Sequence, residues 1–206
     1  MVLRQRREPL SRDRILATAL AIIDAEGLEA LSMRRVGTEL GVEAMSLYNH
    51  VPNKAALLDG LHERILEEMD RPRSTSSWRD HARHQARALR KVLCAHPRAV
   101  TLFATRPATT EAALARLEAH LAVLRAGGFG VLEALHVVQC VAAFVVGHTL
   151  ATVAPRGDDV GAPAYASLDG DVFPNVRAVA SMLGRYHPAR EFERGLDALL
   201  DGFAPR

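Results

Sequence analysis

Along the first 70 residues, apolar side chains recur every three or four positions, the spacing of helices that bury one face. The first such stretch begins after Ser11, a good N-cap residue, and ends at Gly27. Its apolar stripe consists of Ile15, Leu16, Ala19, Ile22 and Ile23. The same spacing predicts further helices over about 33–40, 43–49 and 54–69. This part of the chain is therefore predicted to be a small helical domain.

Residues 31–51 have the pattern of two short helices around a tight turn. Gly41 follows the first helix, where a left-handed conformation costs glycine little, and Gly37 lies where two helices must approach closely. Ser32 is a suitable N-cap for the first helix. The residues expected to face outward from the second helix are Ala44, Met45, Ser46, Tyr48 and Asn49. The pattern favours a helix-turn-helix, whose second helix enters the DNA major groove, and the alternative is an ordinary helical hairpin.

After residue 70 the helical spacing returns, and no strand-like alternation of useful length appears. Helices are predicted over about 78–95, 99–103, 110–126, 131–153, 175–184 and 191–203. Segments 71–77 and 154–171 are rich in Pro, Gly, Ser and Asp and are predicted loops. The pattern therefore predicts an all-α protein of about nine or ten helices. We expect a three-helix helix-turn-helix domain over 1–53, a connector helix over 54–69 and a second helical domain over 70–206.

The predicted helix 131–153 is apolar on most faces and must therefore be buried on most faces, which points to a subunit interface. Its longest apolar run, 137–150, contains Gln139 and His148, so we expect a buried helix and no membrane span. The N-terminus is charged and lacks the apolar stretch of a signal peptide. A cytoplasmic location is expected.

Composition and candidate chemistry favour binding over catalysis. The net charge is only +2, so any DNA contact needs a local basic patch, which the arginines of the first 14 residues offer. Cys94 and Cys140 lack disulfide or metal spacing and are expected to be buried free thiols. His81 and His84 could share a metal ion, but no further ligand completes a set, so surface or pocket histidines are favoured. Ser46 has no base that would activate it, and no enzyme, metal or cofactor is predicted.

The chain resembles the tetracycline-repressor (TetR) family. Over about 11–69 the resemblance is carried by Ala19, Leu20, Gly27, Ala30-Leu31-Ser32, Leu40-Gly41-Val42, Leu47-Tyr48, His50-Val51, Asn53-Lys54 and Ala56-Leu57-Leu58-Asp59. A weaker match to the ligand domain of the tetracycline repressor rests on Ser77-Trp78, Thr105-Arg106-Pro107, Leu117-Glu118, Gly128-Phe129, Glu133-Ala134-Leu135 and 192–202. The resemblance implies an all-α homodimer that represses transcription at a palindromic operator. It also implies that an effector in the ligand-binding and dimerisation domain, 70–206, shifts the connector helix so that the recognition helices lose register.

The DNA-contacting residues that the resemblance implies are Ser32, Arg34, Ala44, Met45, Ser46, Tyr48, Asn49, His50 and Lys54. Arg34 matches an arginine that reads guanine, which its guanidinium can do by a bidentate contact. Tyr48, His50 and Lys54 match residues that hold the phosphate backbone, and the two serines can do likewise. Ala44 and Met45 stand at base-reading positions where they can meet a thymine methyl but cannot make a bidentate hydrogen bond. The operator is therefore expected to differ from that of the tetracycline repressor.

The effector site departs further from the tetracycline repressor. Leu102 and Ala151 stand where that protein holds a drug-bound magnesium ion, so we expect no magnesium–tetracycline recognition. The residues predicted to line a pocket are Gln85, Leu89, Leu102, Phe103, Thr105, His136, Val138, Val141, Phe144 and His148. Such a lining suits a small, mainly apolar molecule with a few polar anchors.

Two hypotheses follow. The first is a ligand-responsive, sequence-specific repressor whose partners are a double-stranded DNA operator, a small-molecule effector and a second copy of the chain. The alternative is a protein of the same fold that does not switch, either a constitutive DNA binder or a small-molecule-binding protein. An effector-dependent change in operator affinity would separate them, because switching requires differential binding to two states.

Overall fold

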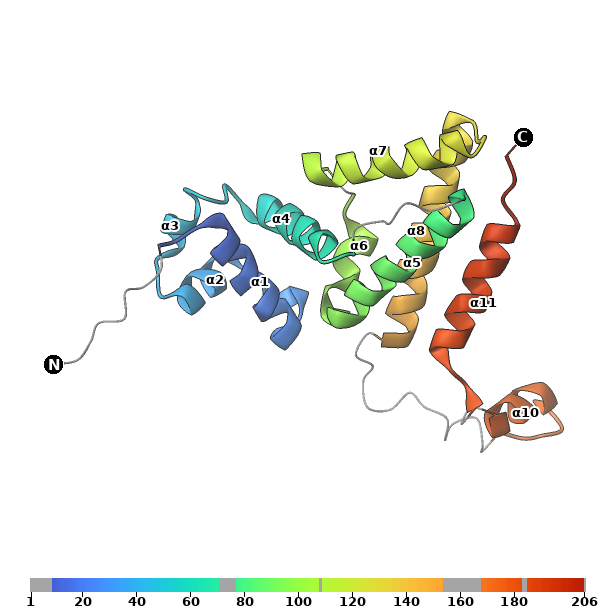
Figure 1. Cartoon of the computed structure of the whole chain (residues 1–206). Helices are drawn as coiled ribbons and strands as arrows, with labels where there is room; N and C mark the ends of the chain where they lie inside the picture. Colours follow the sequence, from blue (N-terminus) through green and yellow to red (C-terminus); the bar gives the residue numbers. More distant parts are fainter. Residues whose placement is uncertain (1–8, 71–76, 108, 154–167, 183–184, 206) are drawn as a thin grey trace.

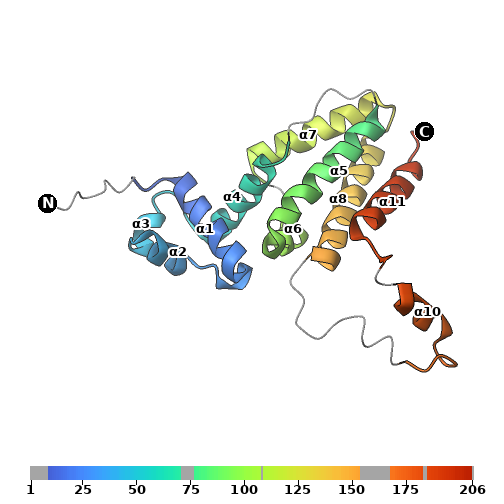
Figure 2. The same cartoon turned by 60° about the horizontal axis from the view of Figure 1, so that its bottom comes forward.

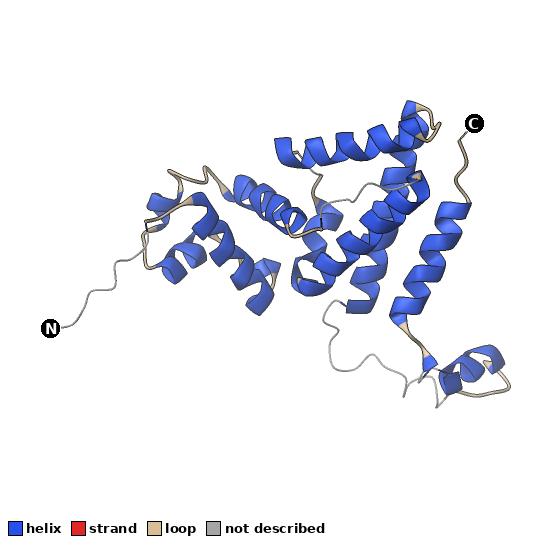
Figure 3. Cartoon of the chain, viewed as in Figure 1, coloured by secondary structure: helices blue, strands red, loops and turns tan. Residues whose placement is uncertain are grey.

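The structure, a computed structural model, describes residues 9–70, 77–107, 109–153, 168–182 and 185–205. Over these ranges the chain forms ten α-helices and two short 3-10 helices and has no strand, which confirms the predicted fold class (Figures 1 and 3). The helices are α1 (Arg12–Glu26), η1 (Leu28–Ala30), α2 (Met33–Leu40), α3 (Ala44–Leu47), α4 (Lys54–Glu67), α5 (Trp78–Ala95), η2 (Pro97–Ala99), α6 (Val100–Thr105), α7 (Glu111–Ala126), α8 (Val131–Val153), α10 (Pro174–Met182) and α11 (Pro188–Asp201). Most of the two predicted loops, at 71–76 and 154–167, lies outside the described residues.

Helices α1 to α4 surround a first apolar core. Ile15, Ile23, Val36, Leu47 and Leu57 are fully buried there. The core does not stop at the small domain, because it continues into side chains of α5, η2 and α6. In Figure 1, α1, α2 and α3 form one end of the molecule and α4 runs from them toward α6.

A second core joins α5, α7, α8 and α11, with Leu93, Phe192, Leu196 and Leu200 almost completely buried. Helix α5 packs on α7, α8 and α11, while α4 contacts α5, α6 and α7. The connector helix is therefore in direct contact with the helices of the second domain.

Helix α8 buries one face and leaves the other open. Ala134, Val137, Val141 and Val145 face the core, whereas Val131 is 68% exposed. The expectation of burial on most faces is therefore not met within one protomer. At 23 residues, with a mean hydropathy of 1.7 in its most apolar window, α8 is the one helix in the described ranges that could cross a membrane by length and composition. Its packing on α5, α6, α7 and α11 instead makes it a core helix of the second domain.

Two helix boundaries differ from the predictions for physical reasons. Helix α3 is four residues long, because the chain after Leu47 tightens into turns that precede Pro52. Helix α11 begins at Pro188, three residues earlier than predicted, since proline suits the first turn of a helix. Helix α10 has no buried residue and stands apart from the other helices (Figure 2).

Candidate nucleic-acid interface and ligand cavity

The turn between α2 and α3 is fixed by two glycines. Gly41 has φ 67° and ψ 36°, a left-handed conformation, and its N–H donates to the carbonyl of Thr38 at 3.1 Å. A Cβ on Gly37 would lie 3.0 Å from the carbonyl oxygen of Val42 and 3.2 Å from the nitrogen of Ala44. Ser32 caps α2, because its Oγ accepts a hydrogen bond from the Arg35 N–H at 3.1 Å. The two helices thus meet in the manner that the sequence predicts.

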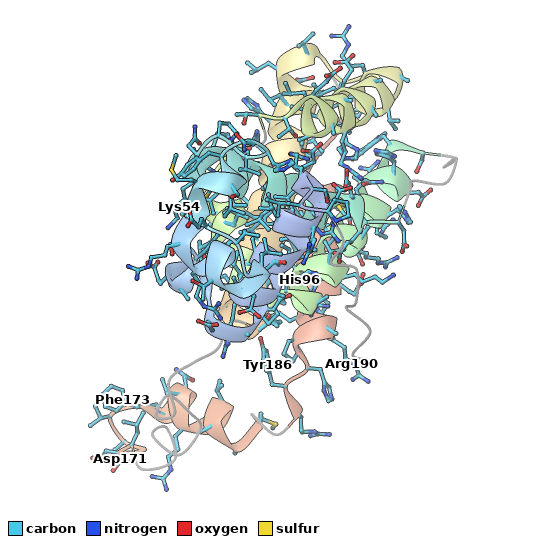
Figure 4. All side chains as sticks on the ribbon, turned by 90° about the vertical axis from the view of Figure 1, so that its left-hand side faces the viewer. Lys54, His96, Asp171, Phe173, Tyr186 and Arg190 are labelled. Atoms are coloured by element: carbon cyan, nitrogen blue, oxygen red, sulfur yellow. The ribbon has the colours of Figure 1, made fainter. Side chains whose placement is uncertain are left out.

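The predicted DNA-contacting side chains lie on the outer face of α3 and in the segments around it. Met45 is 72% exposed and Tyr48 41% exposed, whereas Leu47, between them, is fully buried. The remaining residues of the set divide into exposed Ser32, Arg34, Asn49, His50 and Lys54 and half-buried Ala44 and Ser46. Figure 4, which views this end of the molecule, shows Lys54 at its edge.

Two neighbouring arginines of α2 have different roles. Arg35 is held by Glu26 at 2.6 Å and by Glu39 at 2.7 Å, so its charge is used within the domain. These carboxylates raise the pKa of Arg35 above its ordinary value, mainly through the hydrogen bond with Glu26 and then the one with Glu39. Arg34 is exposed on the same helix. Arg34 is therefore the one of the two whose guanidinium is available to a base edge or a phosphate.

A cavity of about 390 Å³ lies among α4, α5, α6, α7 and α8. Its wall is mostly apolar, with Leu66, Leu89, Phe103, Leu124 and Val141 among the lining side chains. The polar lining residues are His62, His81, Gln85, Arg106, Arg116, His120 and Gln139. A concave, mainly apolar site with a few polar groups is typical of small-molecule binding.

Of the residues predicted to bind a ligand, Gln85, Leu89, Phe103, Val138 and Val141 line this cavity. Five others do not: Leu102, Thr105, His136, Phe144 and His148. These five positions therefore lie outside the wall of this cavity.

The five displaced residues have other environments. Leu102 is fully buried in the first core, while Thr105 and His136 are exposed. Phe144 and His148 instead pack against Phe192 of α11, with ring centroids 5.4 Å away in both cases. On α8, Phe144 is three residues from Val141 and thus about 60° away around the helix, which is enough to face a different neighbour.

A pair of histidines that the sequence did not connect forms part of the cavity wall. His81 Nε2 of α5 and His120 Nδ1 of α7 are 2.9 Å apart, so one ring donates and the other accepts. Burial, and then the proximity of His81 and Arg116, lowers the pKa of His120 to about 4. Burial and His84 also lower the pKa of His81. Both rings are therefore neutral at pH 7.

Gln85 presents an unpaired amide to the same cavity. Its side chain is buried, and neither Oε1 nor Nε2 has a hydrogen-bond partner in the part of the chain that the structure describes. A buried amide without a partner costs about 1–3 kcal/mol. Such a group is well placed to bond a ligand that offers both a donor and an acceptor.

The cavity also touches the connector helix. His62 of α4 lies in its wall and packs against Phe103 of α6, with ring centroids 4.3 Å apart. One turn away, Asp59 of α4 accepts a 2.7 Å hydrogen bond from Arg106, which follows α6. Burial lowers the pKa of His62, with Asp59 partly opposing and Arg106 adding to the effect. These contacts tie the cavity wall to α4, which in turn packs on α1.

The cysteines differ from prediction: Cys94 is half-buried and Cys140 is exposed on the open face of α8. The apolar surroundings of Cys140 in the sequence indicated a helix but could not indicate which face it occupies.

The fold and the exposed face around α3 define a helix-turn-helix DNA-binding protein with a second, cavity-containing domain. Residues 15–61 match the family described as "Bacterial regulatory proteins, tetR family", and residues 71–206 match "Tetracyclin repressor-like, C-terminal domain". The chain belongs to the TetR family, and it is a DNA-binding transcriptional regulator, not an enzyme.

Individual relatives agree with this assignment. An HTH-type transcriptional regulator of Saccharopolyspora erythraea is 37% identical over 151 residues, which are 73% of this chain and only 64% of that protein. The class A tetracycline repressor protein of Escherichia coli is 31% identical over 202 residues, which are 96% of this chain and 92% of that protein. Among solved structures, ActR of Streptomyces coelicolor in complex with actinorhodin aligns with a TM-score of 0.80 at 31% identity, covering 94% of this chain and 96% of that one.

Proposed function

We propose that the protein is a homodimeric repressor that leaves a palindromic operator when a small, mainly apolar molecule enters the cavity. The observation that carries this proposal is the composition of the cavity wall. His62 and Leu66 of the connector helix and Met69 just beyond it line the cavity together with α5 to α8. A ligand that fills the cavity therefore meets α4 directly, and α4 packs on α1 of the DNA-binding domain. Differential binding to two positions of α4 would shift the population of DNA-binding dimers.

The polar groups of the wall suggest the chemistry of the effector. The unpaired Gln85 amide and the neutral pair of His81 and His120 offer hydrogen bonds without charge, while Arg116 suits an acidic phenol or carboxylate oxygen. A polycyclic ring system that carries hydroxyl or carbonyl oxygens would satisfy both. The relatives support this choice, since ActR was solved with actinorhodin and a single-residue variant of TetR from Acinetobacter baumannii with minocycline.

We infer that magnesium takes no part in this recognition. Leu102, at one of the two positions that the resemblance assigns to the metal, has no ligand atom and is fully buried in the first core. Ala151, at the other, is exposed and likewise lacks a ligand atom. Hard divalent cations need oxygen ligands. Binding of a tetracycline-like probe is expected to be the same with and without magnesium.

Operator recognition is proposed to combine one polar base contact with several apolar base contacts. Arg34 would read a guanine, and Ala44 and exposed Met45 would contact thymine methyls. Tyr48, His50, Lys54 and the hydroxyls of Ser32 and Ser46 would hold phosphates, with Asn49 at the remaining base-facing position. Ser32 can cap α2 and still donate its own O–H to a phosphate.

Dimerisation is proposed through the open face of α8 together with α11. The exposed α8 residues Cys140, Ala143, Gly147 and Leu150 recur every three or four positions and are small or apolar, which lets two helices approach closely. The exposed apolar residues of α10, Val176, Val179 and Met182, give a second surface for the partner. Ala143→Arg is expected to give a monomer in sedimentation at micromolar concentration. The control is Ala122→Arg, at an exposed position of α7, which should leave the dimer intact. A dimeric Ala143→Arg protein would contradict this interface.

The first experiment is selection of bound duplexes from a random DNA library at near-physiological salt, followed by effector release. Polycyclic aromatic compounds, beginning with actinorhodin and minocycline, are screened by thermal shift and then titrated against the protein bound to the selected duplex. We expect an enriched palindrome and at least one compound that raises Tm and weakens operator binding. Compounds that raise Tm without any change in operator affinity would support the non-switching alternative and overturn the proposal.

A further inference from the structure

His96 lies where the DNA-binding domain, the connector helix and the second domain meet. It is the C-cap of α5, and its ring is 12% exposed. Nδ1 lies 2.9 Å from a carboxylate oxygen of Asp24 in the last turn of α1, and Nε2 lies 3.0 Å from a carboxylate oxygen of Glu68 at the end of α4. Figure 4 shows His96 at this junction, between the α1 region and the α5 region.

The geometry requires a particular protonation state of this ring. A carboxylate accepts hydrogen bonds and cannot donate them, so both ring nitrogens of His96 must carry a proton to satisfy Asp24 and Glu68 together. Only the imidazolium cation has both protons. In the neutral ring, one nitrogen would turn a lone pair toward a carboxylate oxygen at about 3 Å, and that contact becomes repulsive.

The surroundings favour the cation as well. Three helices, α1, α4 and α5, end at this junction, and a helix C-terminus carries a partial negative charge that favours cations. Two other charged groups nearby are already engaged. Arg98 of η2 donates to the last carbonyls of α1, and Lys91 of α5 pairs with Asp70 at 3.1 Å. Burial opposes the charge on His96, but the hydrogen bonds and charges of Glu68 and Asp24 outweigh it and raise its pKa.

We propose that His96 is a proton-dependent link that holds the DNA-binding domain and the connector helix to the second domain, and that loosens as pH rises and the ring loses its proton. The link sets how freely α1 and α4 move relative to α5, and therefore how well two recognition helices fit one operator. It acts on operator affinity without any effector, so it stands independently of the effector proposed above.

The sign of the effect follows from the direction of the pKa shift. A histidine whose pKa is raised on folding stabilises the protein below its ordinary pKa of 6.5, and this contribution disappears as pH rises through the folded value. Wild type is therefore expected to be more stable than His96→Gln at pH 6, by about 2–4 °C in Tm, and to lose this advantage as pH rises through the folded-state pKa of His96. The operator affinity of wild type relative to His96→Gln is expected to fall over the same interval.

The test measures the imidazole pKa by NMR, Tm and operator affinity between pH 5.5 and 8.5, in the full-length protein with the selected duplex. Asp24→Asn and Glu68→Gln should each lower the pKa of His96, whereas Asp70→Asn, whose partner is Lys91, should not. A His96 that titrates at or below 6.5, or wild type and His96→Gln that differ by the same factor at every pH in stability and operator affinity, would overturn the proposal.

Discussion

Replacement of Gly37 by alanine tests whether the close approach of α2 and α3 sets the recognition helix. A Cβ at this position would lie 3.0 Å from Val42 O, 3.2 Å from Ala44 N and 3.3 Å from Ala44 Cα. All three atoms belong to the backbone of the turn and of the first residue of α3. Because backbone cannot rotate away as a side chain can, the whole turn has to move by a few tenths of an ångström.

Two effects of opposite sign compete in this variant. Alanine is favoured over glycine inside a helix by about 0.8–1 kcal/mol, which alone would stabilise α2. Overpacking of a tight site costs about 1–3 kcal/mol. We expect the second effect to win, with a net loss of about 1 kcal/mol and a fall in Tm of about 2–4 °C for a chain of this length.

The loss of operator affinity should be larger than the loss of stability. A displaced α3 would weaken the contacts proposed between Met45, its neighbours and the bases, and the loss of recognition at one base pair costs about 1–3 kcal/mol. The assays are thermal unfolding and fluorescence anisotropy with the selected duplex. Gly202→Ala is the matched control, because its backbone is helical (φ −70°, ψ −16°) and its Cβ would meet nothing closer than 3.4 Å. A Gly37→Ala protein with raised Tm and unchanged operator affinity would refute the reasoning.

Three further predictions concern single side chains. Arg34→Ala should reduce affinity for the selected duplex far more than for random DNA, with exposed Arg125→Ala as control, and an equal loss on both would refute base reading. Gln85→Leu removes an unpaired buried amide, so Tm should rise by the equivalent of about 1–2 kcal/mol while binding of a thermal-shift hit weakens, and a fall in Tm would show that the amide is already satisfied. The pKa of His120 is lowered to about 4, so the unfolded chain takes up the proton first and folding becomes less favourable as pH falls below 6.5. The Tm of His120→Asn should therefore fall less than that of wild type between pH 6.5 and 4.5. An equal fall in both proteins would contradict the buried neutral pair.

The helices of the N-terminal domain could be predicted almost to the residue because each begins or ends at a local signal. Ser11, Ser32 and Asn53 all cap helices by accepting an N–H from three residues along the chain. Such signals depend only on neighbouring residues, so no tertiary information is needed. The short α3 is the exception, since its length is decided by the turns that follow it.

The cavity could be predicted only in part because a helical stripe does not name the neighbour that it faces. Val141 and Phe144 belong to one apolar helix, yet one lines the cavity and the other packs on α11. The pairing of His81 with His120 requires knowledge that α5 and α7 are adjacent. Helical periodicity identifies which residues are buried. It does not tell which of them line the same cavity or pack on the same neighbouring helix.

The histidine junction shows a signal that the sequence did contain. Acidic residues near a helix C-terminus are unfavourable, because that end already carries partial negative charge. Asp24 lies in the last turn of α1 and Glu68 caps α4, so both break this rule. Places where a sequence breaks a local rule without a local gain are expected to be compensated elsewhere in the fold. Here the compensation is a cation from the end of a third helix, His96, and it is conditional on pH because imidazole is the one common side chain that changes its charge near neutrality.

An arginine at position 96 would give a permanent link. His96→Arg should therefore remove the pH dependence of stability while retaining the Tm that wild type has at acid pH. A variant that keeps the wild-type pH dependence would contradict the assignment.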